Sequence, residues 1–132
     1  TLICFLGDSG GNQSPQSRVA ERLNKEWQTT EARVLQVGDY YHVSQAPVSQ
    51  WLQAQGESTA AIGTHGGITD TSQLLAVNPK QVRPVEAVAL AEDSGVIGDP
   101  RRANAAYGRE ILQRRIEAAV AQIRAAREAM NK

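Results

Sequence analysis

The sequence predicts an α/β fold. Two short apolar runs, Leu2–Leu6 and Ala32–Val37, are each followed by a glycine–aspartate pair, and the continuous run Leu2–Leu6 is typical of a buried parallel strand. Between them, apolar residues recur at the four-residue spacing of a helix face. Strand, helix and strand in this order imply a right-handed parallel crossover.

Length and composition favour one compact domain over residues 1–132, because 41% of the residues are hydrophobic. The 14 basic and 14 acidic residues balance, so nucleic acid and an anionic membrane surface are not expected as partners. No stretch approaches the roughly 18 consecutive apolar residues of a membrane helix. The single cysteine, Cys4, lies in the first apolar run, so we expect a buried thiol in a reducing, cytoplasmic compartment.

The first helix is expected to begin at Ser14, with Pro15 in the first helical position, where its missing N–H costs nothing. Val19, Leu23 and Trp27 form its apolar face, and the helix should end near Trp27.

Polar and aromatic residues, Tyr40–His42, follow the second strand at the end where open α/β sheets bind ligands. A short helix is predicted over Val48–Gln55, ending at Gly56. The apolar run Ala60–Gly63 is predicted as a third short strand.

Two further helices are expected in the second half of the chain. Asp70 or Thr71 is predicted to cap a helix that ends at Asn78. Val85–Leu90 is a further strand-like segment. Asp99, followed by proline, predicts the start of a last helix of about thirty residues, whose far end should pack on something outside this chain.

The sequence indicates a chemical centre in the stretch Gly63–Ser72, which sets His65 and Asp70 five residues apart across a glycine pair. Histidine transfers protons near neutral pH and is the commonest metal ligand. Asp70 could bind a divalent cation or orient the imidazole. The alternative is that Asp70 only caps a helix and His65 only bonds to backbone. For the pair between glycines, function is the favoured interpretation.

A second glycine loop, Gly7–Asn12, has three interpretations. Ser9 could be a nucleophile, as in lipases and esterases that open with a glycine–aspartate–serine block, and Asp39 and His42 imitate their aspartate-x-x-histidine element. That element should lie near the end of the domain, yet ninety residues follow His42.

The same string also surrounds the nucleophile of trypsin-like proteases, but those are double β-barrels, whereas a capped helix is expected here. The third interpretation is a plain turn between strand and helix, whose N–H groups can hold an anion or a substrate oxygen. We expect the two glycine loops to face each other.

Three motifs in this order resemble the creatininase family, the creatinine amidohydrolases and their relatives. Gly7–Asn12 is similar to the family's Asn-Gly-His-Gly-Gly-Asn, His65–Ser72 to its His-Ala-Gly-x-x-Glu-Thr-Ser, and Gly95–Pro100 to its Gly-x-x-Gly-Asp-Pro. The resemblance implies a three-layer α/β/α fold with a mostly parallel sheet, usually assembled into oligomers. It also implies hydrolysis of small cyclic or linear amides with a divalent metal, zinc or manganese, whose bound water is the nucleophile.

The family domain is nearly twice as long as this chain, which resembles its carboxyl half. The resemblance therefore implies an incomplete domain, with the missing amino-terminal half and further copies of the chain as partners. In the family, that half supplies much of the metal site.

Individual residues take roles by the same resemblance. His65 is the expected acid or base beside the substrate, and Tyr41 an aromatic contact to it. Ser9 stands where the family has a metal-binding histidine, and Asp70 where many members have a glutamate. Asp70 is an expected metal ligand, and Asp8 could replace the histidine.

The amides of Gly10 and Gly11, with Asn12, are expected to hold the substrate or its oxyanion. If metal is lost, Ser9 becomes the candidate nucleophile with His65 as base. A member with no catalytic activity, retained as a subunit, is the other alternative.

Overall fold

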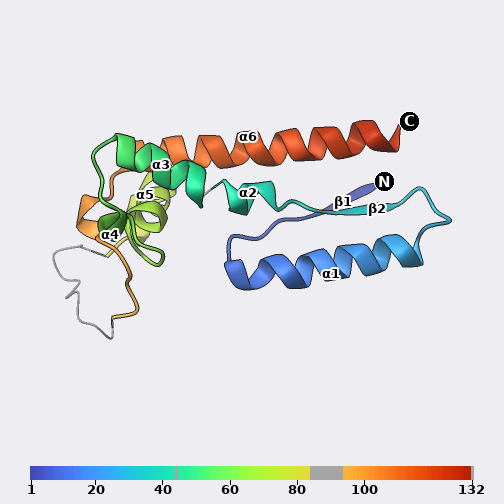
Figure 1. The fold of residues 1–132 in the computed structure, drawn as a ribbon, viewed down its shortest axis with the longest axis horizontal. Helices are drawn as coiled ribbons and strands as arrows, with labels where there is room; N and C mark the ends of the chain where they lie inside the picture. The colour runs from blue at the N-terminus through green and yellow to red at the C-terminus, as the bar shows by residue number, and fades with distance from the viewer. Residues whose placement is uncertain (44, 84–93, 132) are drawn as a thin grey trace. The chain divides into compact units, whose positions relative to one another are not determined.

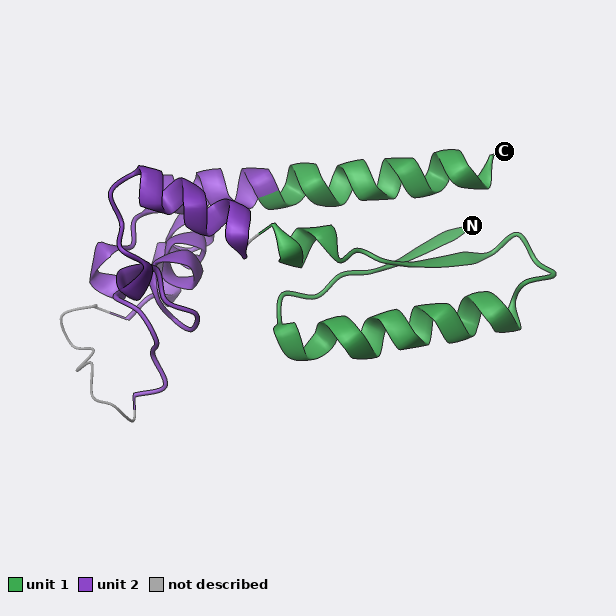
Figure 2. Cartoon of the chain, in the orientation of Figure 1, with its two compact units in different colours: residues 1–43, 115–132 green, residues 44–114 purple. Residues whose placement is uncertain are grey.

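The computed structural model describes residues 1–43, 45–83 and 94–131. The chain divides into two compact units, residues 1–43 with 115–132 and residues 44–114 (Figure 2). Each unit is described by itself below. The expected single domain over the whole chain stays a prediction.

The first unit holds a parallel pair of strands, β1 (Leu2–Phe5) and β2 (Arg33–Gln36), with Leu2 opposite Arg33 (Figure 1). Helix α1 (Gly10–Glu26) connects the strands. The predicted strand–helix–strand crossover and the α/β fold class are confirmed. A single helical turn, α2 (Asp39–His42), follows β2.

Helices cover both faces of this small sheet. Helix α1 lies on one side of the strands, and residues 115–130 of α6 (Ala105–Met130) lie on the other (Figure 1). Both helices also bond to the outer edge of β2. Asn24 of α1 donates to the Val34 carbonyl at 2.8 Å and accepts from the Val34 amide at 2.7 Å, and Gln122 of α6 donates to the Gln36 carbonyl at 3.2 Å. The sheet is thus the middle of three layers.

Helix α1 begins five residues earlier than predicted, with Gly10 and not Pro15 in the first helical position. Ser9 is its N-cap in extended backbone geometry, and Pro15 lies inside the helix instead of opening it. The Gln13 side chain holds the first turn, donating to the carbonyls of Gly7 and Ser9 at 3.0 Å each. Pro15 is the sixth residue of α1, past the first turn, where a proline removes one backbone hydrogen bond and its ring crowds the carbonyl four residues earlier.

Strand β1 is more exposed than predicted. Ile3 is 38% exposed, and Cys4, expected as a buried thiol, is exposed as well. Within the described part of the chain β1 pairs with β2 alone, so its other edge has no neighbouring strand. The continuous apolar run predicted the strand but not its burial.

The second unit is helical. Its elements are α3 (Ala46–Ala54), α4 (Thr59–Ile62), α5 (Ile68–Val77), η1 (Pro79–Gln81), η3 (Pro100–Arg102) and the start of α6. Apolar side chains from several of these are buried, and they make the core of the unit: Val48, Leu52, Ile62, Ile68 and Ile111. Helix α3 and its end at Gly56, which has a φ of 94°, confirm the predicted short helix.

The predicted third strand is wrong. Residues 59–62 form the single turn α4, because Ser58 caps it by accepting from the Ala61 amide at 3.1 Å. Alanine favours a helix over a strand, and Gly63 ends the turn at a φ of 62°.

Two predicted helix starts are also wrong. Helix α5 begins at Ile68, so Asp70 lies in its first turn and is not its cap. Asp99 opens only the short turn η3, and α6 begins at Ala105, where the Asn104 side chain accepts from the Tyr107 amide at 2.9 Å.

The strand-like segment Val85–Leu90 lies outside the described residues. Among the described helices, including the 26-residue α6, none combines the length and the apolar character needed to cross a membrane.

Candidate functional site

In the first unit, candidate site residues meet at the carboxyl ends of the two parallel strands. Asp8 and Ser9 follow β1, and α2 follows β2. A Cβ built on Gly10 would lie 2.8 Å from the Tyr41 hydroxyl, so α2 contacts the first turn of α1. The structure therefore brings together two of the predicted substrate contacts, Gly10 and Tyr41, where α/β sheets commonly bind ligands.

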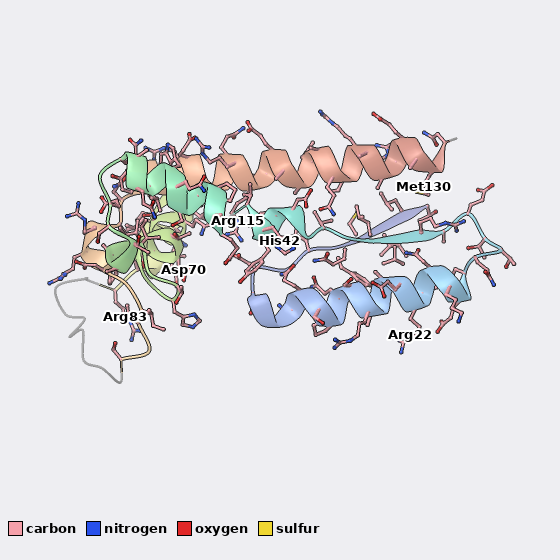
Figure 3. The ribbon with its side chains drawn as sticks, viewed as in Figure 1. Arg22, His42, Asp70, Arg83, Arg115 and Met130 are labelled. Carbon is pink, nitrogen blue, oxygen red and sulfur yellow. The ribbon has the colours of Figure 1, made fainter. Side chains whose placement is uncertain are left out.

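Arg115 of α6 holds this end of the sheet together (Figure 3). Its guanidinium donates to both oxygens of the Asp8 carboxylate, to Oδ2 at 3.2 Å, and forms an ion pair with it. The Arg115 Nε donates to the Tyr40 carbonyl at 3.0 Å, and the guanidinium carbon lies 4.1 Å from the centre of the Tyr40 ring. Arg115 is 1% exposed, so the charge is buried against its partners.

Ser9 occupies the N-cap position of α1, but its side chain makes no capping hydrogen bond. Its φ of −130° and ψ of 138° are ordinary extended geometry. The strained turn on which many hydrolases carry a nucleophilic serine is therefore not present at Ser9. Asp39 and His42, the imitated esterase element, lie in α2 of the same unit.

The glycines that were expected to form a loop belong instead to the first turn of α1. The first amides of a helix have no carbonyl partner inside it, and they carry the positive end of the helix dipole. Gly10 and Gly11 present such amides, whereas the Asn12 amide donates to the Ser9 carbonyl at 3.0 Å. The prediction that these residues hold a substrate oxygen stays a prediction.

In the second unit, His65 lies in a turn fixed by backbone hydrogen bonds. Its amide donates to the Ile97 carbonyl at 3.2 Å, and the Ile97 amide donates to the His65 carbonyl at 2.7 Å. A Cβ on Gly63 would come within 1.8 Å of the Ile97 carbonyl oxygen, so only glycine allows this approach. The His65 side chain itself is exposed on this fixed turn.

Asp70 closes the same turn. Its Oδ2 accepts from the Gly66 amide at 2.8 Å, and the Thr71 hydroxyl donates to the Gly66 carbonyl at 3.0 Å. Gly66 has a φ of 62°, a conformation that other residues rarely adopt. In this arrangement Asp70 positions the backbone next to His65; no hydrogen bond joins their side chains in the described part of the chain.

A buried carboxylate that the sequence analysis did not single out lies deeper in this unit. Glu57 is 6% exposed and pairs with Arg102, whose NH2 group donates to Oε1 at 3.1 Å. The Tyr107 hydroxyl donates to the same oxygen at 3.2 Å. The Arg102 hydrogen bond holds the pKa of Glu57 below its ordinary value, although burial acts in the opposite direction. Burial in turn raises the pKa of Tyr107.

The predicted metal ligands do not form a metal site by themselves. Both Asp8 oxygens accept from Arg115, and one Asp70 oxygen accepts from a backbone amide. Within residues 1–43, 45–83 and 94–131, no three histidine, cysteine, aspartate or glutamate side chains gather as a metal site requires. We therefore assign no chemical step to a metal held by these residues alone.

The predicted site residues fall into two groups. Asp8, Ser9, Gly10, Gly11, Asn12 and Tyr41 belong to the first unit, and His65 and Asp70 belong to the second. That the two glycine stretches face each other stays a prediction.

Sequence analysis missed Arg115, although a signal was present. Arg115 lies four residues from both Ile111 and Ala119, and all three are buried. A cation at a helical position that otherwise carries apolar residues requires a buried partner. The turn at Asp8 is that partner.

A comparison with protein-family models matches residues 1–123 to the creatininase model, described as creatinine amidohydrolase. The match is not confined to one part of the 132-residue chain. Searches of curated proteins and of solved structures gave no significant match. The chain's resemblance to a carboxyl half of the family domain stays an expectation. With nearly all of its residues matched, this chain belongs to the creatininase family.

Proposed function

We propose that this protein is an amidohydrolase that cleaves a C–N bond, other than a peptide bond, in a small cyclic or linear amide. The observation that carries the proposal is the family match over residues 1–123. Members of the creatininase family are generally metal-dependent, and zinc or manganese is the metal we expect for a complete site.

His65 is the residue to which we assign proton transfer. Amide hydrolysis requires a proton on the leaving nitrogen, and an imidazole can deliver it near neutral pH. The backbone around His65 is fixed by its paired bonds with Ile97 and by the bond from Gly66 to Asp70, while the side chain remains exposed. A fixed backbone with an exposed imidazole suits a proton donor.

Release of amine or ammonia from a panel of small linear and cyclic amides tests this function. The purified protein should be assayed after dialysis against zinc or manganese, beside Asp70→Ala, with the metal content of both measured. Turnover by the wild type supports the proposal, and metal that falls away in Asp70→Ala supports the predicted ligand. No turnover of any amide at full metal loading would contradict the proposal.

A second candidate is a subunit with no activity of its own. The observation in its favour is the Asp8 carboxylate, which is already bound by Arg115 at the position where a further metal ligand was expected. In that case the protein would bind the small amides without releasing product. Calorimetry would then detect binding where the turnover assay detects no product.

The serine-esterase alternative has a direct test of its own. Ser9 precedes a helix whose dipole would favour a serine anion, and Asp39 and His42 lie in the same unit. A fluorophosphonate probe should then label Ser9. The extended geometry of Ser9 leads us to expect no adduct.

A further inference from the structure

We propose that Arg115 takes the place of a metal cation at Asp8, so that the carboxylate after β1 is neutralised by a guanidinium of the same chain. This inference concerns the charge balance at Asp8 and does not rest on the proposed amide hydrolysis. The first observation is that both carboxylate oxygens accept from the guanidinium, which is the two-point geometry in which arginine binds a carboxylate best.

The second observation is the burial of Arg115. At 1% exposure its charge lies away from water, and a buried charge is stable only with a partner and with its hydrogen bonds made. Asp8 supplies the opposite charge, the Tyr40 carbonyl accepts from Nε at 3.0 Å, and the Tyr40 ring faces the guanidinium at 4.1 Å. A metal that took Asp8 would compete with this ion pair for the Asp8 carboxylate.

The third observation is the place of these partners in the fold. Asp8 ends β1, Tyr40 lies just after β2, and Arg115 lies on α6. One side chain therefore ties together the carboxyl ends of both strands and the helix over the sheet. A divalent cation could coordinate both the Asp8 carboxylate and the Tyr40 carbonyl, but it would not attach them to α6, as the Arg115 side chain does.

The proposal makes Arg115 a positioning residue for the turn that carries Ser9 and Gly10. It also removes Asp8 from the predicted metal ligands, and leaves open a metal bound by other residues. Asp39 is a matched control, because it follows a glycine after β2 as Asp8 follows a glycine after β1.

A double-mutant cycle on the full chain tests the pairing. Asp8→Asn and Arg115→Met, which fills similar space without charge, should each lower the folding equilibrium constant about tenfold or more in urea titrations. In the Arg115→Met background, Asp8→Asn should lower the folding equilibrium constant less than about threefold. If the unfolding free energies lost in the two single variants add in full in the double variant, the proposal is overturned.

A metal-binding measurement tests the replacement. Wild type, Asp8→Asn and Asp39→Asn should retain equal zinc after equilibrium dialysis and elemental analysis. Zinc lost from Asp8→Asn and kept by Asp39→Asn would show a metal at Asp8 and overturn the proposal. If Arg115→Met does not fold, Asp8→Asn and Asp39→Asn still decide: Asp8→Asn should be less stable than the wild type, and equal stability of all three contradicts the pairing.

Discussion

The Tyr41 hydroxyl packs against Gly10, so closely that a Cβ at position 10 would lie 2.8 Å from the hydroxyl oxygen. The two residues come from the turns after β1 and β2, which the parallel pairing of these strands brings to one end of the sheet. The contact makes glycine at position 10 a requirement of packing. Neighbouring Gly11 has no such constraint, because its Cβ would come no nearer than 3.8 Å to another atom.

Gly10→Ala should displace Tyr41 and destabilise the fold, whereas Gly11→Ala should be neutral or stabilise it by up to about 1 kcal/mol, since alanine favours the helix. Thermal unfolding measures both. In a Tyr41→Phe background, which lacks the hydroxyl, the cost of Gly10→Ala should largely vanish. If Gly10→Ala still destabilises the Tyr41→Phe variant, the loss of stability does not come from the contact with the Tyr41 hydroxyl.

Gly63→Ala should destabilise the turn that carries His65 more than Gly95→Ala does. Both glycines have positive φ, 62° and 74°, which costs an alanine about 1–2 kcal/mol. At Gly63 the new Cβ would also collide with backbone, 1.8 Å from the Ile97 carbonyl oxygen, whereas at Gly95 no atom of the described residues lies within 4 Å. Urea titrations should show about 1–3 kcal/mol of additional loss for Gly63→Ala, and equal losses would contradict the close approach.

The Glu57 cluster should make stability depend on acid pH. The hydrogen bond from Arg102 lowers the pKa of Glu57 in the folded state, so the charged carboxylate stabilises the fold above the ordinary pKa of 4.5. This contribution is lost as the pH falls through the lowered folded-state pKa. Glu57→Gln should therefore be less stable than the wild type near pH 7, and the difference should shrink on acidification.

The measurement for Glu57 is the urea midpoint between about pH 7 and about pH 3. Glu110→Gln is the control, because Glu110 pairs with Arg114 at 2.7 Å on the helix surface with its side chain 42% exposed. Such surface pairs contribute little to stability. A pH dependence of Glu57→Gln identical to that of the wild type would show that the Glu57 carboxylate is not its source.

The sequence predicted the parts of the fold that periodicity and turn residues determine. The parallel strands, the crossover and the end of α3 at Gly56 followed from apolar runs and glycines. Helix starts were predicted less well, because capping groups compete locally. At α6 the Asn104 side chain accepts from the Tyr107 amide, whereas Asp99, predicted as the start, caps only the short turn η3. At α1 the N-cap residue Ser9 makes no side-chain capping bond, so no such bond marks the start of this helix.

The candidate site was predictable in its residues but not in its contacts. The glycines near Ser9 and His65 stand out in the sequence, yet the Asp8 carboxylate finds its partner 107 residues away in Arg115. Such a pairing follows from tertiary packing, which local patterns do not encode. The sequence indicates such a pairing only through a charged residue at a buried helical position.

The central functional claim is that His65 transfers the proton in hydrolysis of a small amide, and the chain offers one matched control, its other histidine, His42. The decisive measurement is the kcat of amide turnover for His65→Gln and His42→Gln, with folding of both verified. We predict a loss of about a hundredfold or more for His65→Gln and little change for His42→Gln. Full activity in His65→Gln, or a loss found only in His42→Gln, would contradict the assignment.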